Sequence, residues 1–195
     1  MFIQTEPTPN PDTLKFLPGQ TVTGPSGPYD FAALEEAGIS PLAQALFNVE
    51  GVVRVFLADD FISLTKASES DWKHVRPMAL AAIMDHFVAG LPAISVDQAS
   101  PQSAEDVGTV EDYEGETAEI VGEIIELIET RVRPAVAQDG GDIVFHRFDP
   151  DSGVVRLSMR GACAGCPSST FTLKQGIENM LKAYVPEVTA VEAAL

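Results

Sequence analysis

Apolar residues in the first 92 positions fall in short runs that proline and glycine separate. Runs of this kind are typical of β-strands joined by turns. We therefore expect short strands at 2–5 and 13–17, and a hairpin whose strands span 51–57 and 61–65.

Two helices are expected within the same stretch. Ser40 and Pro41 are residue types preferred at an N-cap and at the first helical position, so one helix is predicted to begin there. Ser70 is expected to cap a second helix, and Pro77 to kink or split it. The apolar side of this second helix carries Trp72, Val75, Ala79, Ile83 and Phe87. Strands mixed with helices predict a small α+β domain.

The last third of the chain has a clearer pattern, in which a helical period is followed by strand alternation and then by a second helical period. The predicted elements are a helix at 117–132 closed by Pro134, a turn at 139–142, strands at 143–148 and 154–159, a helix ending before Pro186, and a strand at 187–191. This segment is therefore expected to fold in the order α-β-β-α-β.

Charge adds a boundary between these two parts. The 195 residues carry a formal net charge of −17, and residues 93–116 hold seven acidic residues and no basic one. A stretch with such charge and few large apolar residues cannot offset its chain entropy by burial. We expect an α+β protein of two small domains, 1–92 and 117–195, joined by a flexible acidic linker at 93–116. The alternative for the linker is an acidic interaction tail.

The same charge excludes two classes of partner. Nucleic acids and anionic membranes would be repelled, and no apolar run approaches the roughly 20 residues of a transmembrane helix. The first residues, MFIQTE, lack the features of a signal peptide or presequence. A bacterial cytoplasmic location is therefore expected, with the mitochondrial matrix as the alternative for a processed organellar protein.

The candidate chemistry lies in the two cysteines of the chain, Cys163 and Cys166. Their spacing lets two sulfurs reach one metal centre, and Gly161 and Gly165 allow backbone amides to approach them. The residues at 167–169 are typical of a helix start, which would place free N–H groups beside Cys166 and favour the thiolate.

The ligand count limits what this pair can hold. A structural zinc site needs four protein ligands, and His74, His86 and His146 do not pair with the cysteines at metal spacing. An iron–sulfur cluster needs four thiolates, which two chains contributing two each would supply. The alternatives are a thioredoxin-like dithiol oxidoreductase, a pure interaction module, and two buried cysteines without a role.

Three motifs resemble the C-terminal NifU-like domain: GACAGCPSST at 161–170, LKQGIE at 173–178 and DGGD at 139–142. Residues 8–16, TPNPDTLKF, and 46–52, LFNVEGV, resemble the N-terminal domain of the Nfu type. Together these resemblances cover nearly the whole chain apart from the predicted linker.

The resemblance implies a carrier of iron–sulfur clusters, not an enzyme. Cys163 and Cys166 of a homodimer would hold a bridging [4Fe–4S] cluster, accepted from an upstream scaffold and delivered to apo-proteins. A [2Fe–2S] cluster accepts four sulfurs as well, so the ligand count does not choose between them. Arg160 and Lys174 are expected either to moderate the negative charge of the cluster and its thiolates or to be mere solubility charges. Gly140 and Gly141 are expected to form the turn into the strand.

Overall fold

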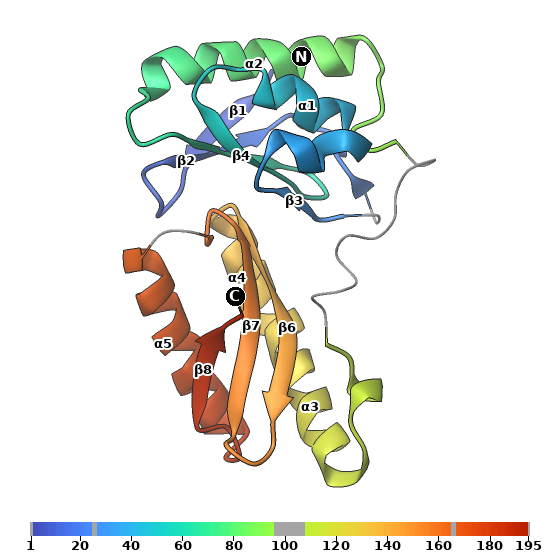
Figure 1. Cartoon of the computed structure of the whole chain (residues 1–195), viewed down its shortest axis with the longest axis vertical. Helices are drawn as coiled ribbons and strands as arrows, with labels where there is room; N and C mark the ends of the chain where they lie inside the picture. Colours follow the sequence, from blue (N-terminus) through green and yellow to red (C-terminus); the bar gives the residue numbers. More distant parts are fainter. Residues whose placement is uncertain (1, 25–26, 96–107, 165–166, 195) are drawn as a thin grey trace. The chain divides into compact units, whose positions relative to one another are not determined.

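The computed structural model describes residues 2–24, 27–95, 108–164 and 167–194. The chain divides into two compact units, Met1–Gln102 (unit 1) and Ser103–Leu195 (unit 2). Each unit has its own sheet and its own core, which confirms the predicted α+β class (Figure 1). Within the described ranges, no helix combines the length and the apolar character needed to cross a bilayer.

Unit 1 contains a five-stranded antiparallel sheet with the strand order β1-β2-β5-β4-β3. Its strands are β1 (Gln4–Pro7), β2 (Thr13–Leu17), β3 (Tyr29–Phe31), β4 (Val52–Leu57) and β5 (Ile62–Lys66). The predicted hairpin is β4–β5, and the first strand lies two residues later than expected. The sequence pattern did not indicate β3, because a strand of three residues is too short for alternation to show.

Helices α1 (Pro41–Phe47) and α2 (Trp72–Val88) cover one face of this sheet, preceded by the 3-10 helix η2 (Leu34–Ile39) (Figure 1). Ser40 caps α1 as predicted, because its Oγ accepts the Ala43 N–H at 3.0 Å. The cap of α2 is Asp71, whose Oδ1 accepts the Lys73 N–H at 2.9 Å, so the prediction of Ser70 was wrong by one residue.

Of the two effects expected of Pro77, a kink or a split, the split does not occur, and the helix runs from Trp72 to Val88. Proline removes one N–H donor from the helix and leaves the carbonyl of Lys73 without its usual i+4 partner. Burial of Val75, Ala79 and Ile83 against the sheet supplies the packing energy that keeps the helix continuous across this point.

His86 near the end of α2 is buried, with 4% of its surface exposed. Its ring meets Phe87 edge-on at 5.6 Å, and its Nε2 is buried without a hydrogen-bond partner among the described residues. Burial lowers the pKa of His86, and hydrogen bonds to the backbone of Leu91 and Pro92 offset this only in part. The folded protein therefore favours the neutral imidazole.

We expect this residue to make the free energy of unfolding of unit 1 depend on pH. Below about pH 6.5 the unfolded chain binds a proton at His86 that the folded chain resists, so stability is lost as the pH falls from there through the lowered folded pKa. Urea unfolding at several pH values would measure this pH dependence of the free energy of unfolding. The His86→Leu variant should show a smaller loss below about pH 6.5, and an unchanged slope would contradict the assignment.

Unit 2 has the predicted order α-β-β-α-β. Its elements are the 3-10 helix η4 (Val110–Asp112), α3 (Gly115–Leu127), the π-helical turn η5 (Ile128–Val132), α4 (Arg133–Gln138), β6 (Gly141–Asp149), β7 (Val154–Gly161), α5 (Pro167–Tyr184) and β8 (Ala190–Ala193). Strand β7 lies in the centre, antiparallel to β6 and parallel to β8. Buried side chains of the sheet and of the helices form one core.

The first helix of unit 2 is longer than predicted, because it continues past Pro134 to Gln138. The π-helical turn η5 shifts the hydrogen-bond register just before Pro134, which then occupies the first turn of α4. Proline is tolerated there because its missing N–H would have no intrahelical partner. The last strand also lies later than the predicted 187–191, at Ala190–Ala193.

Both ends of the predicted linker, 93–116, pack against the units. Ala93 and Ile94 belong to the core of unit 1, and the N–H of Ser95 donates to Ile39 O at 2.8 Å. In unit 2 the hydroxyl of Tyr113 accepts from Phe148 N at 2.8 Å and reaches Phe148 O at 3.1 Å. The rest of that stretch, 96–107, lies outside the described residues, so the flexible linker and the boundaries at 92 and 117 stay predictions.

Candidate functional site

Cys163 lies in the turn between β7 and α5, the strand-to-helix junction that the sequence predicted. Two backbone bonds hold this turn: Ala162 N–H donates to Gly140 O at 3.2 Å, and Ala164 N–H donates to Gly161 O at 3.0 Å. Gly161 has φ +61°, a backbone conformation that L side chains rarely adopt. Cys166 lies outside the described residues.

The side chain of Cys163 is 8% exposed and packs with the apolar core of unit 2. Among the described residues it forms no disulfide. A thiol in this position is held by its own domain and is poorly accessible to a bulky reagent.

Gly141, the first residue of β6, lies directly against Cys163. A Cβ atom at position 141 would come within 2.6 Å of Cys163 Sγ and within 2.9 Å of Arg160 O. Only glycine leaves this space for the sulfur. Gly140, by contrast, makes the turn as predicted, with φ +79° and its N–H donating to Ala137 O at 3.1 Å. The sequence pattern placed both glycines in the turn and did not show the contact of Gly141 with the sulfur.

A buried ion pair lies next along β6. Asp142 is 6% exposed and accepts two hydrogen bonds from Arg133, with Nε–Oδ1 at 2.8 Å and Nη2–Oδ2 at 3.1 Å. Arg133 also donates to both carboxylate oxygens of Glu129. Burial opposes the charge of Arg133, but the bonds to Asp142 and Glu129 outweigh it and raise the pKa of Arg133. The pair fastens the long helix to the strand that carries Gly141.

Arg160 stands opposite Asp142 in the β6–β7 ladder and is 8% exposed. A mere solubility charge would lie exposed, so that alternative was wrong for Arg160. Lys174 lies on α5 and is half-buried. The roles of both cations toward a bound group remain predictions.

The three histidines lie in three different environments. His74 is exposed on α2, His86 is buried in unit 1, and His146 is half-buried at the bulge of β6. Within the described ranges, no three residues of the types His, Cys, Asp and Glu come together as a set that would hold a metal ion.

Replacing Asp142 tests the ion pair. The Asp142→Asn variant should lower the free energy of unfolding of unit 2 by about 1–3 kcal/mol, because the partly buried guanidinium of Arg133 loses its bidentate partner. Denaturant unfolding measures this loss. The control is Asp151→Asn in the exposed turn after β6, which should change stability by less than about 0.5 kcal/mol. Equal effects of the two substitutions would contradict the structural role of the pair.

Comparisons with known proteins match both parts of the chain. Residues 3–90 match the domain family described as scaffold protein Nfu/NifU N terminal, and residues 124–192 match the NifU-like domain. A NifU-like protein from Saccharomyces cerevisiae of known structure is 26% identical, with a TM-score of 0.45, over 49% of this chain and 86% of that one.

Two curated relatives extend over nearly the whole chain. NifU-like protein 4, mitochondrial, from Arabidopsis thaliana is 49% identical over 98% of this chain and 65% of its own length. The NFU1 iron-sulfur cluster scaffold homolog, mitochondrial, from Drosophila willistoni is 48% identical over 98% of this chain and 63% of its own. The chain thus spans just under two thirds of the length of these relatives. With an Nfu/NifU N-terminal domain followed by a NifU-like domain, the chain belongs to the Nfu-type family of NifU-like proteins.

Proposed function

We propose that this protein carries an iron–sulfur cluster as cargo and delivers it to apo-proteins. The observation that carries the proposal is the C-x-x-C pair inside the NifU-like domain, in a chain with no other cysteine and with relatives named as iron–sulfur cluster scaffolds. Sulfur is the ligand that these clusters require.

The shortage of sulfur in one chain favours a dimer. One protomer offers Cys163 and Cys166, whereas a cluster takes four thiolates, so two protomers sharing one cluster supply the full set. We propose [4Fe–4S] as the cargo. The ligand count suits [2Fe–2S] equally, and iron analysis separates the two.

The surroundings of Cys163 fit a residue that binds metal through its sulfur. The turn that carries Cys163 is held by backbone bonds to Gly140 and Gly161, and Gly141 leaves the space that the sulfur occupies. A ligand fixed in this way loses little conformational freedom when it binds, which favours acceptance of the cargo. Among the described residues, the sulfur packs with the apolar core of unit 2 and lies against the backbone of Gly141.

Delivery then needs only ligand exchange. A client thiolate forms a bond to iron as the bond to a carrier cysteine breaks, so each step replaces one thiolate by another, and the oxidation state of the cargo does not change. The protein contributes binding and release and no chemical turnover, which is a carrier role and not that of an enzyme.

The partners follow from this role. They are a second copy of the chain in the loaded state, an upstream scaffold that supplies the cluster, and apo iron–sulfur proteins that receive it. The relatives are named as mitochondrial, which favours the organellar alternative; the expected bacterial cytoplasmic location finds no support in them.

Anaerobic reconstitution with iron and sulfide tests the proposal. The loaded protein should be brown and contain about four irons and four sulfides per dimer. A dithiol oxidoreductase would instead stay colourless and monomeric and reduce insulin disulfides with turnover. Tightly held zinc after metal-free preparation would contradict the proposal, because it would indicate a closed four-ligand site.

A further inference from the structure

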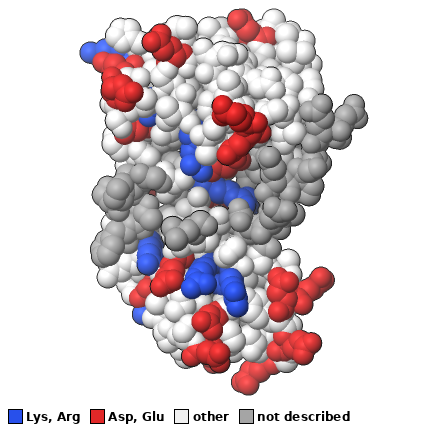
Figure 2. Space-filling view, in the orientation of Figure 1, with Lys and Arg blue, Asp and Glu red and all other residues white. Residues whose placement is uncertain are grey.

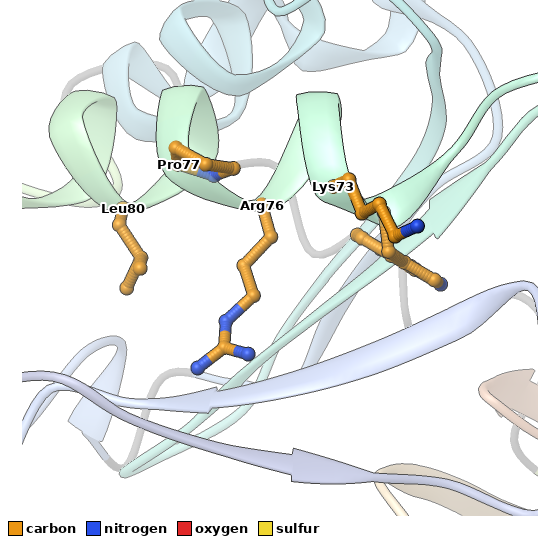
Figure 3. A pocket seen from close by; sticks show the side chains of 5 residues that line it. Lys73, Arg76, Pro77 and Leu80 are labelled. Atoms are coloured by element: carbon orange, nitrogen blue, oxygen red, sulfur yellow. The ribbon is translucent and has the colours of Figure 1, made fainter.

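A second candidate site lies on unit 1, far along the sequence from the cysteines. One side of α2 forms a groove of about 440 Å³ lined by Trp72, Lys73, Arg76, Pro77 and Leu80, which we call the α2 groove. Arg76 and Leu80 extend from the same side of the helix (Figure 3). The groove combines an apolar lining with two cations.

The aromatic wall of the groove is fixed in place. The indole Nε1 of Trp72 donates to Pro11 O at 3.1 Å, and its ring packs at 6.5 Å on the buried ring of Phe16. Pro77 leaves the carbonyl of Lys73 without an i+4 donor, which provides a backbone acceptor on this helix. A preformed wall of this kind costs little ordering entropy when a ligand binds.

The two cations of the groove are unusual for unit 1. Its other basic residues each pair with a carboxylate: Lys15 with Glu6, Arg54 with Asp30, and Lys66 with Asp12. In the part of unit 1 that the structure describes, neither Lys73 nor Arg76 has a carboxylate within ion-pair distance. Acidic side chains are spread over the face of both units drawn in Figure 2, and in the described part of unit 1 Lys73 and Arg76 are the Lys and Arg residues that lie outside ion pairs.

Apolar surface continues from the groove along α2. Pro77, Ala81, Met84 and Val88 recur at helical spacing on the exposed side, where Met84 is 40% and Val88 76% exposed. Helices of globular proteins normally present polar residues to water. Exposed methionine with aromatic and arginine side chains is the composition enriched at protein–protein interfaces.

We propose that the α2 groove docks an acidic segment of a partner protein that also carries an apolar anchor side chain. Carboxylates of the segment pair with Lys73 and Arg76, while the anchor packs against Trp72 and Leu80. The net charge of −17 does not prevent this, because charges beyond about 8 Å are screened at physiological salt. A nucleic acid, with a charge at every phosphate, meets that repulsion along its whole length.

Trp72 is the only tryptophan of the chain, so its fluorescence reports directly on the groove. The probe is an acetylated dodecapeptide that alternates Glu with Leu and Phe, added to the full chain. We expect a saturable change in tryptophan emission with a dissociation constant on the order of 10–100 μM, matched by the anisotropy of a labelled peptide. The Lys73→Glu/Arg76→Glu double variant should bind at least about tenfold more weakly.

The matched control is Arg147→Glu/Arg156→Glu in unit 2, two exposed arginines whose reversal changes the net charge by the same amount. It should bind the peptide as the unchanged chain does. Circular dichroism checks that both double variants remain folded. A peptide with Gln in place of Glu, and another with Ser in place of Leu and Phe, should each bind markedly more weakly.

Four results would overturn the proposal: equal weakening in the two double variants, anisotropy without any change in tryptophan emission, no binding up to about 1 mM peptide, or competition by single-stranded oligouridylate. The proposal does not rest on the cysteines. The Cys163→Ala/Cys166→Ala variant should bind the peptide unchanged, so failure of docking and failure of cluster binding are distinguishable.

Discussion

The Cys163→Ala variant is expected to retain less than about a tenth of the iron and sulfide that the unchanged protein binds on anaerobic reconstitution. Each protomer then offers one thiolate, so a dimer supplies two of the four that the proposed cargo needs. Alanine suits the apolar surroundings of this position better than serine, whose hydroxyl would need a partner there. Iron and sulfide analysis after desalting measures the loss.

A control must separate the missing ligand from a disturbed turn. Ala164→Ser alters the next residue of the same turn, where the side chain is only half-buried, and it leaves both thiols in place. It should load normally, and Cys163→Ala should keep the circular dichroism spectrum of the unchanged chain. If Cys163→Ala loads as fully as Ala164→Ser, the assignment of Cys163 as a ligand is wrong.

Gly141→Ala should have the second-largest effect, although glycine contributes no ligand. The new methyl group would lie 2.6 Å from Cys163 Sγ and 2.9 Å from Arg160 O, so either the sulfur or the strand must move. Overpacking of this kind costs about 1–3 kcal/mol, and we expect that loss in the free energy of unfolding of unit 2. We also expect a several-fold loss of bound iron, because the displaced sulfur no longer sits where its partner ligands need it.

Gly176→Ala on α5 is the matched control for this substitution. Nothing lies within 4 Å of a Cβ atom at position 176, and alanine favours a helix over glycine by about 0.5–1 kcal/mol. This variant should be as stable as the unchanged chain, or more so, and should load fully. If Gly141→Ala loads fully and keeps its stability, the position of the Cys163 sulfur does not depend on the absence of a side chain at residue 141.

Most of the architecture could be predicted from local sequence, because it depends on local signals. The helical period before 139 and the strand alternation on either side of residues 149–153 predicted the helix and the hairpin of unit 2, and both are present. The cap at Ser40 likewise needs only a side-chain oxygen and the amide of Ala43. Capping and periodicity act within a few residues, and a single sequence carries them in full.

Other features depend on contacts between distant residues, which no local pattern carries. Pro77 and Pro134 were expected to interrupt or end helices, but packing of Val75 and Ile83, and the π-helical turn before Pro134, keep those helices continuous. The contact of Gly141 with Cys163 joins positions 22 residues apart across a strand ladder. The doubled glycine of the DGGD motif was the one local signal that a close approach occurs there.

The central claim is that two protomers share one cluster because each owns half of its ligands. Native mass spectrometry of the reconstituted protein, kept anaerobic, tests this most directly by counting chains and cluster atoms in one particle. We predict that all bound iron and sulfide appears in a species of two chains with about four irons and four sulfides. A loaded species that contains a single chain, with no added thiol completing its ligand set, would contradict the account.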